Sequence, residues 1–394
     1  MARVIVVGAG PMGIAAALGA IDRGHDVTVL ERGEVGASLR TWGATRFFSP
    51  LAMNVSPRMR ELLATLDGTL DDALDDGALL TGSEYADRIL VPLSEREPLR
   101  GRVRTGHRVV AIGRRGLTRG GFAGHPLRAE RPFRVLVESA AGEELLEAEH
   151  ILDASGGLVV PRPFGVGGLP VRGESRLARR PIRTLGELLS LRDQLRGKRV
   201  LLVGDGHSAA NAIVFLDALA REDANTRVVW AVRTPNRRPC EEVANDPLPE
   251  RDAIVARANA LAETPPPYLT MQRRAMIDAV VQTNGHVTVA LTGDRSVEAD
   301  YIAAFTGYRP DASFISELTV ETSPVTEGGA RLYNAIANVT DCLSVPKVRP
   351  HDLESGEPGY WFIGSRGYGR ARTFLLQTGL QQLETVLACI PKAS

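Results

Sequence analysis

The chain has 394 residues, and its 47 Lys and Arg residues balance 47 Asp and Glu residues, so its charge favours neither nucleic acid nor an anionic membrane. Apolar residues make up 44% and charged residues 24%, as in soluble globular proteins, and no stretch is apolar over the roughly 20 residues that span a bilayer. This length exceeds that of one ordinary core, so we expect two domains. The balanced charge favours small-molecule partners, and the lack of a long apolar stretch favours a cytoplasmic location.

A glycine-rich turn follows the first apolar strand, residues 4–7. Gly8, Gly10 and Gly13 come next, and then small apolar residues at helical spacing. In such a turn the first glycine provides the backbone angle, the second lets the main chain approach a pyrophosphate, and the third lets helix and strand touch. The following strand ends in Glu31, whose carboxylate suits the two hydroxyls of an adenosine ribose. The turn therefore predicts a site for FAD or NAD.

The segment that follows changes pattern several times. Residues 32–58 lack a clear period and indicate a loop. Residues 59–87 are predicted to be helical and acidic, with Leu62, Leu63, Leu66 and Leu70 on one face. Residues 103–151 alternate in short runs separated by turns, which predicts an antiparallel meander. A buried strand then ends in DASGG, at Ser155 and Gly156.

A second glycine turn follows a Gly- and Pro-rich crossover at residues 161–170. Its strand is followed by Gly204, Gly206 and Ala209, and the next strand ends in Arg233, with Arg237 and Arg238 close behind. A guanidinium cannot accept a hydrogen bond from a ribose hydroxyl, but it attracts a 2′-phosphate. Arg233 therefore favours NADPH over NADH. The alternative is that Arg233 is a solvated strand end.

The rest of the chain indicates how the domains are connected. A mostly helical insertion is expected at about 236–280, and a later strand ends near Gly307. The closing segment contains an apolar strand ended by Gly364, a Gly- and Arg-rich loop and a long helix. We predict an α/β fold with two Rossmann-like domains, the NADPH domain being inserted in a discontinuous FAD domain. The expected boundaries are 1–165 and 311–394 for FAD, and 166–310 for NADPH.

The spacing of the cysteine and histidine residues argues against a redox dithiol and against a metal site. Cys240, Cys342 and Cys389 are isolated, and no CxxC pair exists that could act as a redox dithiol or a zinc site. The histidines lack metal-ligand spacing, so no metal is expected.

With these motifs the chain resembles flavoproteins that have two dinucleotide-binding domains, among them thioredoxin reductases, flavin-containing monooxygenases and N-hydroxylating monooxygenases. The resemblance rests on GAGPMG with Glu31, DASGG, GDGHSA with Arg233, AAFTGYRPD and the closing FIGS and TFLLQTGLQQ, and it covers nearly the whole chain. It implies FAD and NADPH as cofactors. The residues it assigns to cofactor binding are Gly8, Gly10, Pro11, Met12, Gly13, Glu31, Arg32, Trp42, Gly43, Val109, Ser155, Gly156, Gly204, Gly206, His207, Ser208, Ala209, Arg233, Arg237, Arg238, Gly307, Gly364, Gln377, Thr378 and Gly379.

Particular roles follow from the resemblance. Trp42 and Gly43 would flank the flavin, and the backbone of Val109 would lie near the adenine. Residues 377–379 would place a helix N-terminus against the pyrimidine end of the flavin, where reduction creates negative charge. His207 would pack against the cofactor rather than act as a base.

The reaction of the reduced flavin depends on a further segment of the sequence. The run RFFSPLAMNVSP is similar to a segment of flavin-containing monooxygenases, and Asn54 is the counterpart of their catalytic asparagine. An Asn before a proline turn is also a common structural choice. The FxGxxxH signature of those enzymes lacks its histidine here, in FGVGGLPVRGE.

A group of arginines in the last loop suggests a substrate site. Arg366, Arg370 and Arg372 lie between the last strand and last helix, in a loop that two glycines would keep mobile. They would bind a carboxylate or phosphate of the substrate, or else be solvated surface charges.

The leading hypothesis is an NADPH-dependent flavin monooxygenase, in which reduced flavin captures O2 as a C4a-(hydro)peroxyflavin and oxygenates an amine nitrogen or sulfur of a small molecule. One alternative is a reductase that passes electrons to a ferredoxin-like partner. Another is a flavin redox sensor without turnover. Whether the chain forms a homodimer is left open by its sequence.

Overall fold

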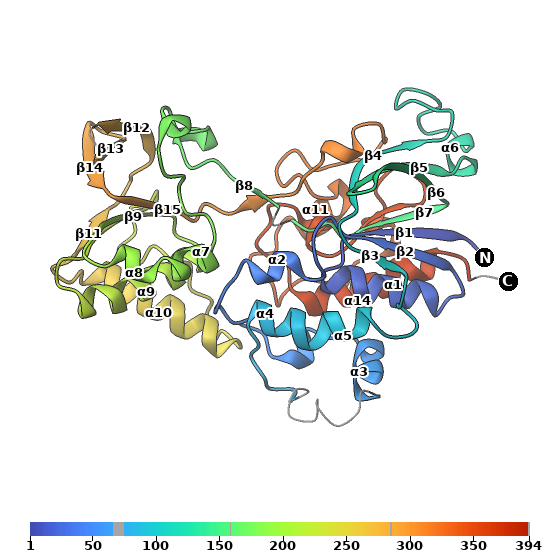
Figure 1. The fold of residues 1–394 in the computed structure, drawn as a ribbon, viewed down its shortest axis with the longest axis horizontal. Coiled ribbons are helices and arrows are strands. Elements are labelled where there is room, and N and C mark those ends of the chain that lie inside the picture. Colours follow the sequence, from blue (N-terminus) through green and yellow to red (C-terminus); the bar gives the residue numbers. More distant parts are fainter. Residues whose placement is uncertain (66–74, 158, 284–285, 393–394) are drawn as a thin grey trace. The chain divides into compact units, whose positions relative to one another are not determined.

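We describe a computed structural model of the chain, which covers residues 1–65, 75–157, 159–283 and 286–392 (Figure 1). The chain divides into two compact units. Unit 1 contains residues 1–40, 49–160 and 308–394, and unit 2 contains residues 41–48 and 161–307. The chain crosses between them at β8 (Val160–Pro161) and β16 (Tyr308–Arg309), which pair with each other.

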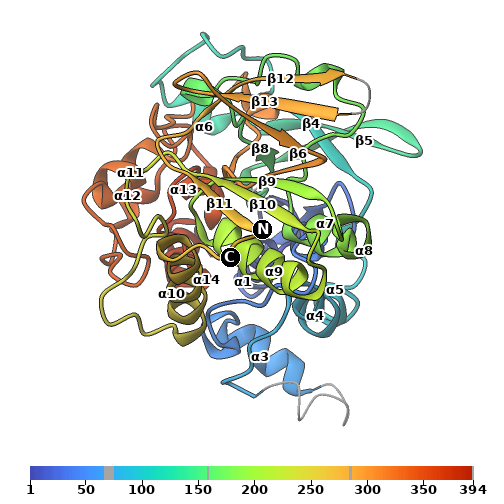
Figure 2. The same ribbon diagram turned by 90° about the vertical axis from the view of Figure 1, so that its left-hand side faces the viewer.

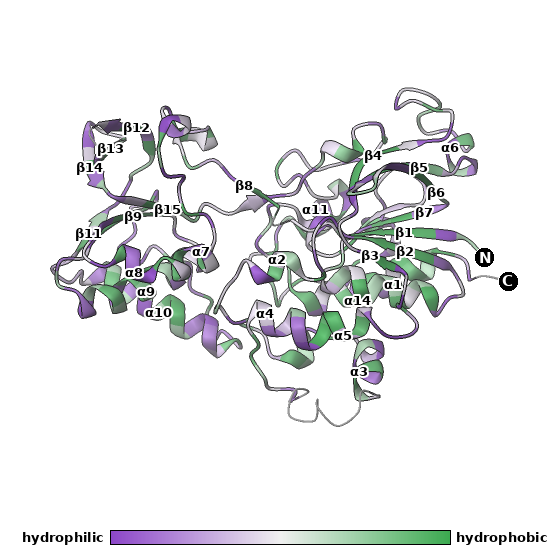
Figure 3. Ribbon diagram, in the orientation of Figure 1, coloured by the Kyte–Doolittle hydropathy of each residue, from purple (hydrophilic) through white to green (hydrophobic). Residues whose placement is uncertain are grey.

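Unit 1 is built on a five-stranded parallel sheet in the order β17-β7-β1-β2-β3. The strands are β1 (Arg3–Val7), β2 (Asp26–Leu30), β3 (Val103–Arg104), β7 (His150–Asp153) and β17 (Tyr360–Phe362). The last strand of the chain thus joins the first sheet, as expected for a discontinuous domain. Most of β1, β2 and β7 is hydrophobic (Figure 3), as strands covered on both faces should be.

Two layers cover this sheet. On one face lies the antiparallel sheet of β4 (Arg108–Arg114), β5 (Phe133–Ser139) and β6 (Gly142–Ala148), whose Phe133 and Val135 pack in one cluster with Ile5 and Val7. On the other face, α1 (Pro11–Ile21) packs against α14 (Leu376–Cys389). The meander expected at residues 103–151 is present, except that its first and last strands belong to the parallel sheet.

The remaining helices of unit 1 are short. They are α2 (Ala37–Arg40), α3 (Pro57–Ala64), α4 (Gly82–Tyr85), α5 (Val91–Ser94), α6 (Leu127–Glu130), α11 (Ala330–Ile336), α12 (Pro350–Leu353), α13 (Ser365–Tyr368), the 3₁₀ turns at Leu51–Met53 and Ser313–Ile315, and a π-helical turn at Ala86–Leu90. The helix expected at residues 59–87 is therefore interrupted, since α3 ends at Ala64 and residues 78–80 are not helical. Leu66 and Leu70 lie outside the described residues.

Unit 2 is a second Rossmann-like unit with a four-stranded parallel sheet in the order β11-β10-β9-β15. Its strands are β9 (Arg199–Val203), β10 (Arg227–Ala231), β11 (Leu269–Gln272) and β15 (Tyr301–Ala304), and its helices are α7 (Leu185–Ser190), α8 (Arg192–Leu195), α9 (His207–Glu222) and α10 (Pro249–Glu263), with 3₁₀ turns at Val166–Gly168 and Glu174–Arg176. In Figure 2, α9 and α10 lie on one face of this sheet and a three-stranded antiparallel sheet lies on the other: β12 (Ile277–Thr283), β13 (His286–Leu291) and β14 (Arg295–Ala299).

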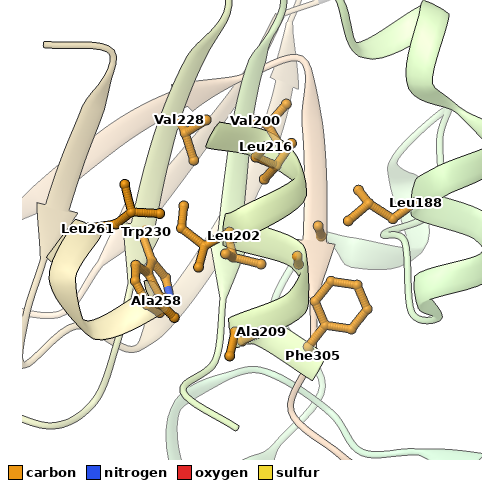
Figure 4. Packing of buried hydrophobic residues seen from close by; sticks show 14 of the residues in the cluster. Leu188, Val200, Leu202, Ala209, Leu216, Val228, Trp230, Ala258, Leu261 and Phe305 are labelled. Carbon is orange, nitrogen blue, oxygen red and sulfur yellow. The ribbon is translucent and has the colours of Figure 1, made fainter. Parts of the chain in front are cut away.

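Alternating strand residues supply the two cores of unit 2. Leu202 and Trp230 face α9 and α10, where they meet Ala258 and Leu261 (Figure 4). The odd-numbered neighbours, such as Leu201, pack with the antiparallel sheet. The insertion expected to be mostly helical at 236–280 is helical only in α10, because β11 adds an edge strand to the sheet and β12 begins the next one.

The fold class expected from the sequence is confirmed: both units are α/β, with parallel sheets. Among the residues that the structure describes, no helix is both long and apolar enough to cross a membrane.

Candidate functional site

The first glycine turn joins β1 to α1 and shows which glycines the protein's own packing requires. Gly8 has φ +99°, and a Cβ added there would lie 2.7 Å from the Ala154 carbonyl oxygen. A Cβ on Gly13 would lie 1.9 Å from the oxygen of Gly8. A Cβ on Gly10, however, would meet no protein atom within 4 Å. The side of the turn at Gly10 is therefore open, as the approach of a pyrophosphate requires.

Glu31 lies directly beside this turn. Its Oε2 accepts a hydrogen bond of 2.8 Å from the backbone N–H of Ala9, and its Oε1 accepts one of 2.9 Å from the N–H of Gly33. A carboxylate has about four acceptor positions, so two remain for hydroxyl donors. The two N–H groups hold the carboxylate in one orientation and leave its other acceptor positions available.

The carboxyl ends of three neighbouring strands meet around the same turn. Ala154, after β7, contacts Gly8, and the Ser365 hydroxyl after β17 accepts a hydrogen bond of 3.1 Å from the Gly157 N–H. Met12 lies between two more glycines, since a Cβ on Gly364 would be 2.4 Å from its Cγ and a Cβ on Gly379 would be 3.0 Å from its Sδ. The structure therefore brings together four segments that the sequence analysis assigned to FAD.

Ser155 and Gly156 belong to this group. The Ser155 hydroxyl donates a hydrogen bond of 2.5 Å to Asp153, and Gly156 has φ +87°. Val109 lies in β4 at a bulge opposite Val137, and the preceding His107 donates its N–H to the Glu31 carbonyl at 2.8 Å. The backbone just before Val109 thus runs beside Glu31. Arg32, next along the chain, is exposed.

Three long helices begin with no side-chain cap and no acidic residue in their first turn. They are α1, α9 and α14, which start after Gly10, Gly206 and Leu375. By contrast, Ser56 caps α3, and α10 has two acidic residues in its first turn. An uncompensated N-terminus attracts an anion or the negative end of a ligand. The first turn of α14 contains Gln377 and Thr378, the residues expected at the flavin.

The second glycine turn, in unit 2, repeats most of this geometry. Gly204 has φ +123°, and a Cβ there would lie 2.4 Å from the Phe305 oxygen. A Cβ on Gly206 would meet no atom within 4 Å, as at Gly10. The third position holds Ala209, which is buried. His207 and Ser208, in the first turn of α9, are exposed.

The backbone register corrects one part of the sequence analysis. The Gly8 N–H bonds to the carbonyl of Leu30, and the Gly204 N–H bonds to the carbonyl of Ala231. The counterpart of Glu31 is therefore Val232, which is buried, and Arg233 is the counterpart of Arg32. The carboxylate is not exchanged for a guanidinium at the same position; Arg233 lies one residue further along, at the rim.

The three arginines expected at the second site differ in their surroundings. Arg233 and Arg237 are exposed, and within the described part of the chain neither side chain has a hydrogen-bond or ion-pair partner. Arg238, however, pairs with Glu242 and with Glu263, the latter at 2.9 Å. Its charge is already compensated, which makes it the weakest of the three candidates.

Residues 41–48 belong with unit 2, whereas the sequence analysis placed Trp42 and Gly43 in the FAD domain. The reason is a close backbone approach: Gly43 has φ +61°, and a Cβ on it would lie 2.7 Å from the Cα of Gly186. The Thr41 carbonyl accepts a hydrogen bond of 3.2 Å from the Gly186 N–H, and the rings of Phe48 and His207 lie 5.4 Å apart. Trp42 packs 4.9 Å from Phe47. Gly307 likewise belongs to unit 2, where its carbonyl accepts the Arg162 N–H at 2.9 Å.

Asn54, the expected catalytic residue, makes contacts that close a turn of the chain. Its side chain is 3% exposed, its Nδ2 donates to the Ser49 carbonyl at 2.9 Å, and its Oδ1 accepts from the Ser49 hydroxyl at 2.8 Å. The buried Tyr85 donates its hydroxyl to the Asn54 carbonyl at 2.6 Å. Both ends of the amide are thus committed to closing the turn at residues 49–54.

The expected substrate arginines are also placed differently. Arg366 is 0% exposed and pairs with the equally buried Asp153 at 2.9 Å, which also accepts the Tyr360 hydroxyl. Arg370 pairs with Glu327 at 2.6 Å, and Arg372 is exposed and has an interaction of its own.

The loop that carries these arginines is packed rather than mobile. A Cβ on Gly369 would lie 2.1 Å from the Thr326 oxygen, so this glycine permits close packing. Sequence reasoning missed the buried pair of Asp153 and Arg366, because no local pattern indicates that an arginine between two glycines will be buried.

Neither a metal site nor a thiol pair occurs in the part of the chain that the structure describes. No three His, Cys, Asp or Glu side chains there are grouped to hold a metal ion. Cys240 and Cys342 are buried, and burial raises the pKa of the Cys240 thiol to about 12, which keeps it protonated. Cys389 is exposed, but it ends α14, about 20 Å from the helix N-terminus at 1.5 Å per residue.

Comparisons with known proteins agree with the fold. Residues 5–89 match the family model described as pyridine nucleotide-disulphide oxidoreductase. A search of the curated proteins gave no match.

Solved structures of two enzyme classes share the whole fold. Bacillithiol disulfide reductase from Bacillus cereus aligns with a TM-score of 0.65 at 18% identity, covering 98% of each chain. Ornithine hydroxylase from Pseudomonas aeruginosa aligns with a TM-score of 0.64 at 14% identity, covering 99% of this chain and 98% of that one. Ornithine N-hydroxylase from Kutzneria, solved with reduced FAD, NADP+ and L-ornithine, aligns with a TM-score of 0.61 at 17% identity, covering 98% and 96%. The resemblance to flavoproteins with two dinucleotide-binding domains is thereby confirmed as one of fold.

Proposed function

We propose that this protein is an FAD-dependent oxidoreductase that takes its electrons from NADPH. The observation that carries the proposal is the pair of glycine turns, each leading into a helix with no side-chain cap and no acidic residue in its first turn, one beside Glu31 and the other with Arg233 just past the next strand. Solved neighbours that contain FAD and NADP+ support the same two cofactors.

The residues of unit 1 suit FAD. The open side of the turn at Gly10 and the N–H groups at the start of α1 would hold the pyrophosphate, and Glu31 would accept the ribose hydroxyls. The N-terminus of α14, next to Met12 and Gly364, would stabilise negative charge on the reduced ring. FAD, when bound, supplies the hydride acceptor; the chain supplies position and electrostatic stabilisation.

The residues of unit 2 suit NADPH. The start of α9 would face its pyrophosphate, and the exposed guanidinium of Arg233 would face its 2′-phosphate. Val232, at the position of Glu31, offers no acceptor to a ribose hydroxyl, so selectivity would depend on the phosphate.

The purified protein gives a direct test. We expect a yellow protein that releases FAD on heating and whose flavin absorbance is bleached faster by NADPH than by NADH under anaerobic conditions. A colourless protein that cannot be reconstituted with FAD would contradict the proposal.

As the finer function we propose oxygenation of an amine nitrogen or a sulfur of a small molecule. It is supported by the N-hydroxylating enzymes among the neighbours and by the lack of a cysteine pair that could pass electrons to a disulfide. The burial of Cys240 and the distance of Cys389 from the start of α14 add to this argument.

A second candidate is a reductase that passes electrons to an external acceptor, such as a ferredoxin-like protein. Two observations favour it: the amide of Asn54 is buried and bonded at both ends to Ser49, and the histidine of the monooxygenase signature is absent. Bacillithiol disulfide reductase has the same fold.

Labelled oxygen separates the two candidates. The NADPH-reduced enzyme is mixed with ¹⁸O2 and a panel of small amines and thioethers, and the masses of the products are measured by mass spectrometry. Incorporation of one ¹⁸O atom supports oxygenation. Release of hydrogen peroxide alone, together with fast reduction of a protein acceptor, supports the reductase.

A further inference from the structure

Arg274 occupies a position in unit 2 whose counterpart in unit 1 is a glycine. The Val232 N–H bonds to the Gln272 carbonyl and the Ala275 N–H bonds to the Val232 carbonyl, at 2.9 and 3.0 Å; Glu31, Arg104 and His107 repeat this pattern at 3.0 and 2.8 Å. A third bond extends the match: Arg274 donates its N–H to Thr234 at 3.4 Å, as Gly106 does to Gly33 at 3.1 Å.

The two matched residues share an unusual backbone conformation. Gly106 has φ +67° and Arg274 has φ +50°, both in the left-handed region. This conformation is accessible to glycine without steric cost but strains a residue that has a Cβ. Unit 1 therefore has the residue that the backbone favours, whereas unit 2 keeps a strained arginine at the same place.

Other side chains fix Arg274 beside Arg233 without pairing with it. Arg295 donates to the carbonyls of Arg273 and Arg274 at 3.0 and 2.8 Å, and Arg273 donates to the carbonyls of Asn236 and Arg237 at 3.1 and 3.2 Å. The two bonds of Arg273 join the loops that follow β10 and β11, and the two bonds of Arg295 anchor the loop after β11 to β14.

The guanidinium of Arg274 itself lacks a counter-charge. Its side chain is exposed and, in the described ranges, has no hydrogen-bond or ion-pair partner, which is also true of Arg233 and Arg237. Two loops thus present three uncompensated positive charges at one edge of the sheet, and bringing them together costs energy that a bound anion returns.

We propose that Arg274 is a specificity-determining residue that, together with Arg233, binds the 2′-phosphate of NADPH. Guanidinium groups on two adjacent strand ends supply planar N–H donors from two sides, an arrangement suited to a phosphate with several acceptor oxygens. The inference rests on the proposed function, because it concerns the adenosine end of the same site. It explains why the strained arginine is kept.

The test uses the full-length protein and the substitution R274G, which gives unit 2 the residue of unit 1. Binding of 2′,5′-ADP and of 5′-AMP is measured by titration calorimetry. We expect R274G to weaken 2′,5′-ADP about tenfold and to leave 5′-AMP unchanged. Since glycine relieves the backbone strain, the thermal midpoint should stay the same or rise.

A control variant removes the same charge elsewhere in unit 2. Arg196 precedes β9 at the amino edge of the sheet, where it pairs with Glu222 at 3.2 Å. R196A should leave both affinities within about twofold, which excludes a general effect of net charge.

The outcomes separate the inference from the proposed function. If the unaltered protein binds 2′,5′-ADP no more tightly than 5′-AMP, its preference for NADPH is wrong and the inference falls with it. If the preference exists but R274G keeps it, only the role of Arg274 is wrong. If R274G loses the preference and R196A does not, both stand.

Discussion

The two glycine turns have similar geometry at their first two glycines but differ at the third residue and at the end of the neighbouring strand. In unit 1, Gly13 lies so close to Gly8 that no side chain fits, whereas Ala209 occupies this position in unit 2. In unit 1 the strand next to the turn, β7, ends in the buried Asp153, whereas in unit 2 the corresponding β15 ends in Ala304. The first glycines, Gly8 and Gly204, are alike in their positive φ and close approach to the next strand, and the middle glycines, Gly10 and Gly206, are alike in having no protein atom near a Cβ placed there.

The comparison separates two kinds of glycine in such a motif. A glycine explained by the protein's own packing reports how closely a helix approaches a strand. A glycine that packing does not explain reports space left for a ligand. The backbone register likewise decides which residues correspond: Val232, and not Arg233, is the counterpart of Glu31.

The largest expected effect comes from exchanging the third residues of the turns. Gly13→Ala places a methyl group 1.9 Å from the carbonyl oxygen of Gly8, whose N–H is bonded to Leu30 of the neighbouring strand. We expect a loss of at least about 3 kcal/mol in the free energy of unfolding, with loss of FAD. Ala209→Gly should cost about 1 kcal/mol, the usual penalty of glycine in a helix. Denaturant unfolding followed by circular dichroism measures both, and equal losses would contradict the comparison.

The next effect concerns the buried ion pair under the first turn. Arg366→Met leaves the Asp153 carboxylate buried without its cation, which should cost about 3–5 kcal/mol. Adding Asp153→Asn should recover part of this loss. Arg370→Ala, which breaks the half-exposed pair with Glu327, should cost at most about 1 kcal/mol. If Arg366→Met were instead as stable as Arg370→Ala but failed in turnover, the arginine would have the substrate role first expected of it.

A crossed pair of substitutions tests the assignment of the two cofactors. Glu31→Ala should lower the FAD content of the purified protein, because it removes the ribose acceptor and two bonds that order the turn. Arg233→Ala should leave the FAD content unchanged and raise KM for NADPH about tenfold, with little effect on KM for NADH. The absorbance ratio of flavin to protein and steady-state kinetics give the two readouts. Any loss of FAD in Arg233→Ala would show that the two sites are not separate.

The smallest effect is a difference in acid sensitivity. Burial lowers the pKa of His25 and of His150, both in unit 1, whereas His207 and His286 in unit 2 are exposed. A histidine kept neutral by the fold stabilises it above its unfolded pKa of about 6.5, and this contribution is lost as the pH falls from there towards the folded pKa. FAD release on warming should therefore occur at lower temperature at pH 5 than at pH 7. The substitution His150→Leu should reduce this difference; an unchanged difference would exclude His150 as its source.

The sequence predicted the parts of the molecule that depend on local pattern. Both glycine turns, the strands around them and the return of the last strand to the first sheet follow from periodicity and turn residues. The sequence did not predict contacts between distant segments. Nothing near Asn54 indicates that Ser49 bonds both ends of its amide, and nothing near Gly43 indicates that Gly186 approaches it. Arg274 was overlooked because its significance lies in a backbone angle and in its match with Gly106.

The eight residues from Thr41 to Phe48 have a practical consequence for dissecting the molecule. They pack on Gly186 and His207 although the rest of their unit begins only at Pro161. A fragment cut at Pro161 and Gly307 would therefore lack part of its own unit, including the Phe48 ring that packs against His207 at the start of α9. A soluble, well-behaved half should instead be obtained by grafting that octapeptide back through a short linker.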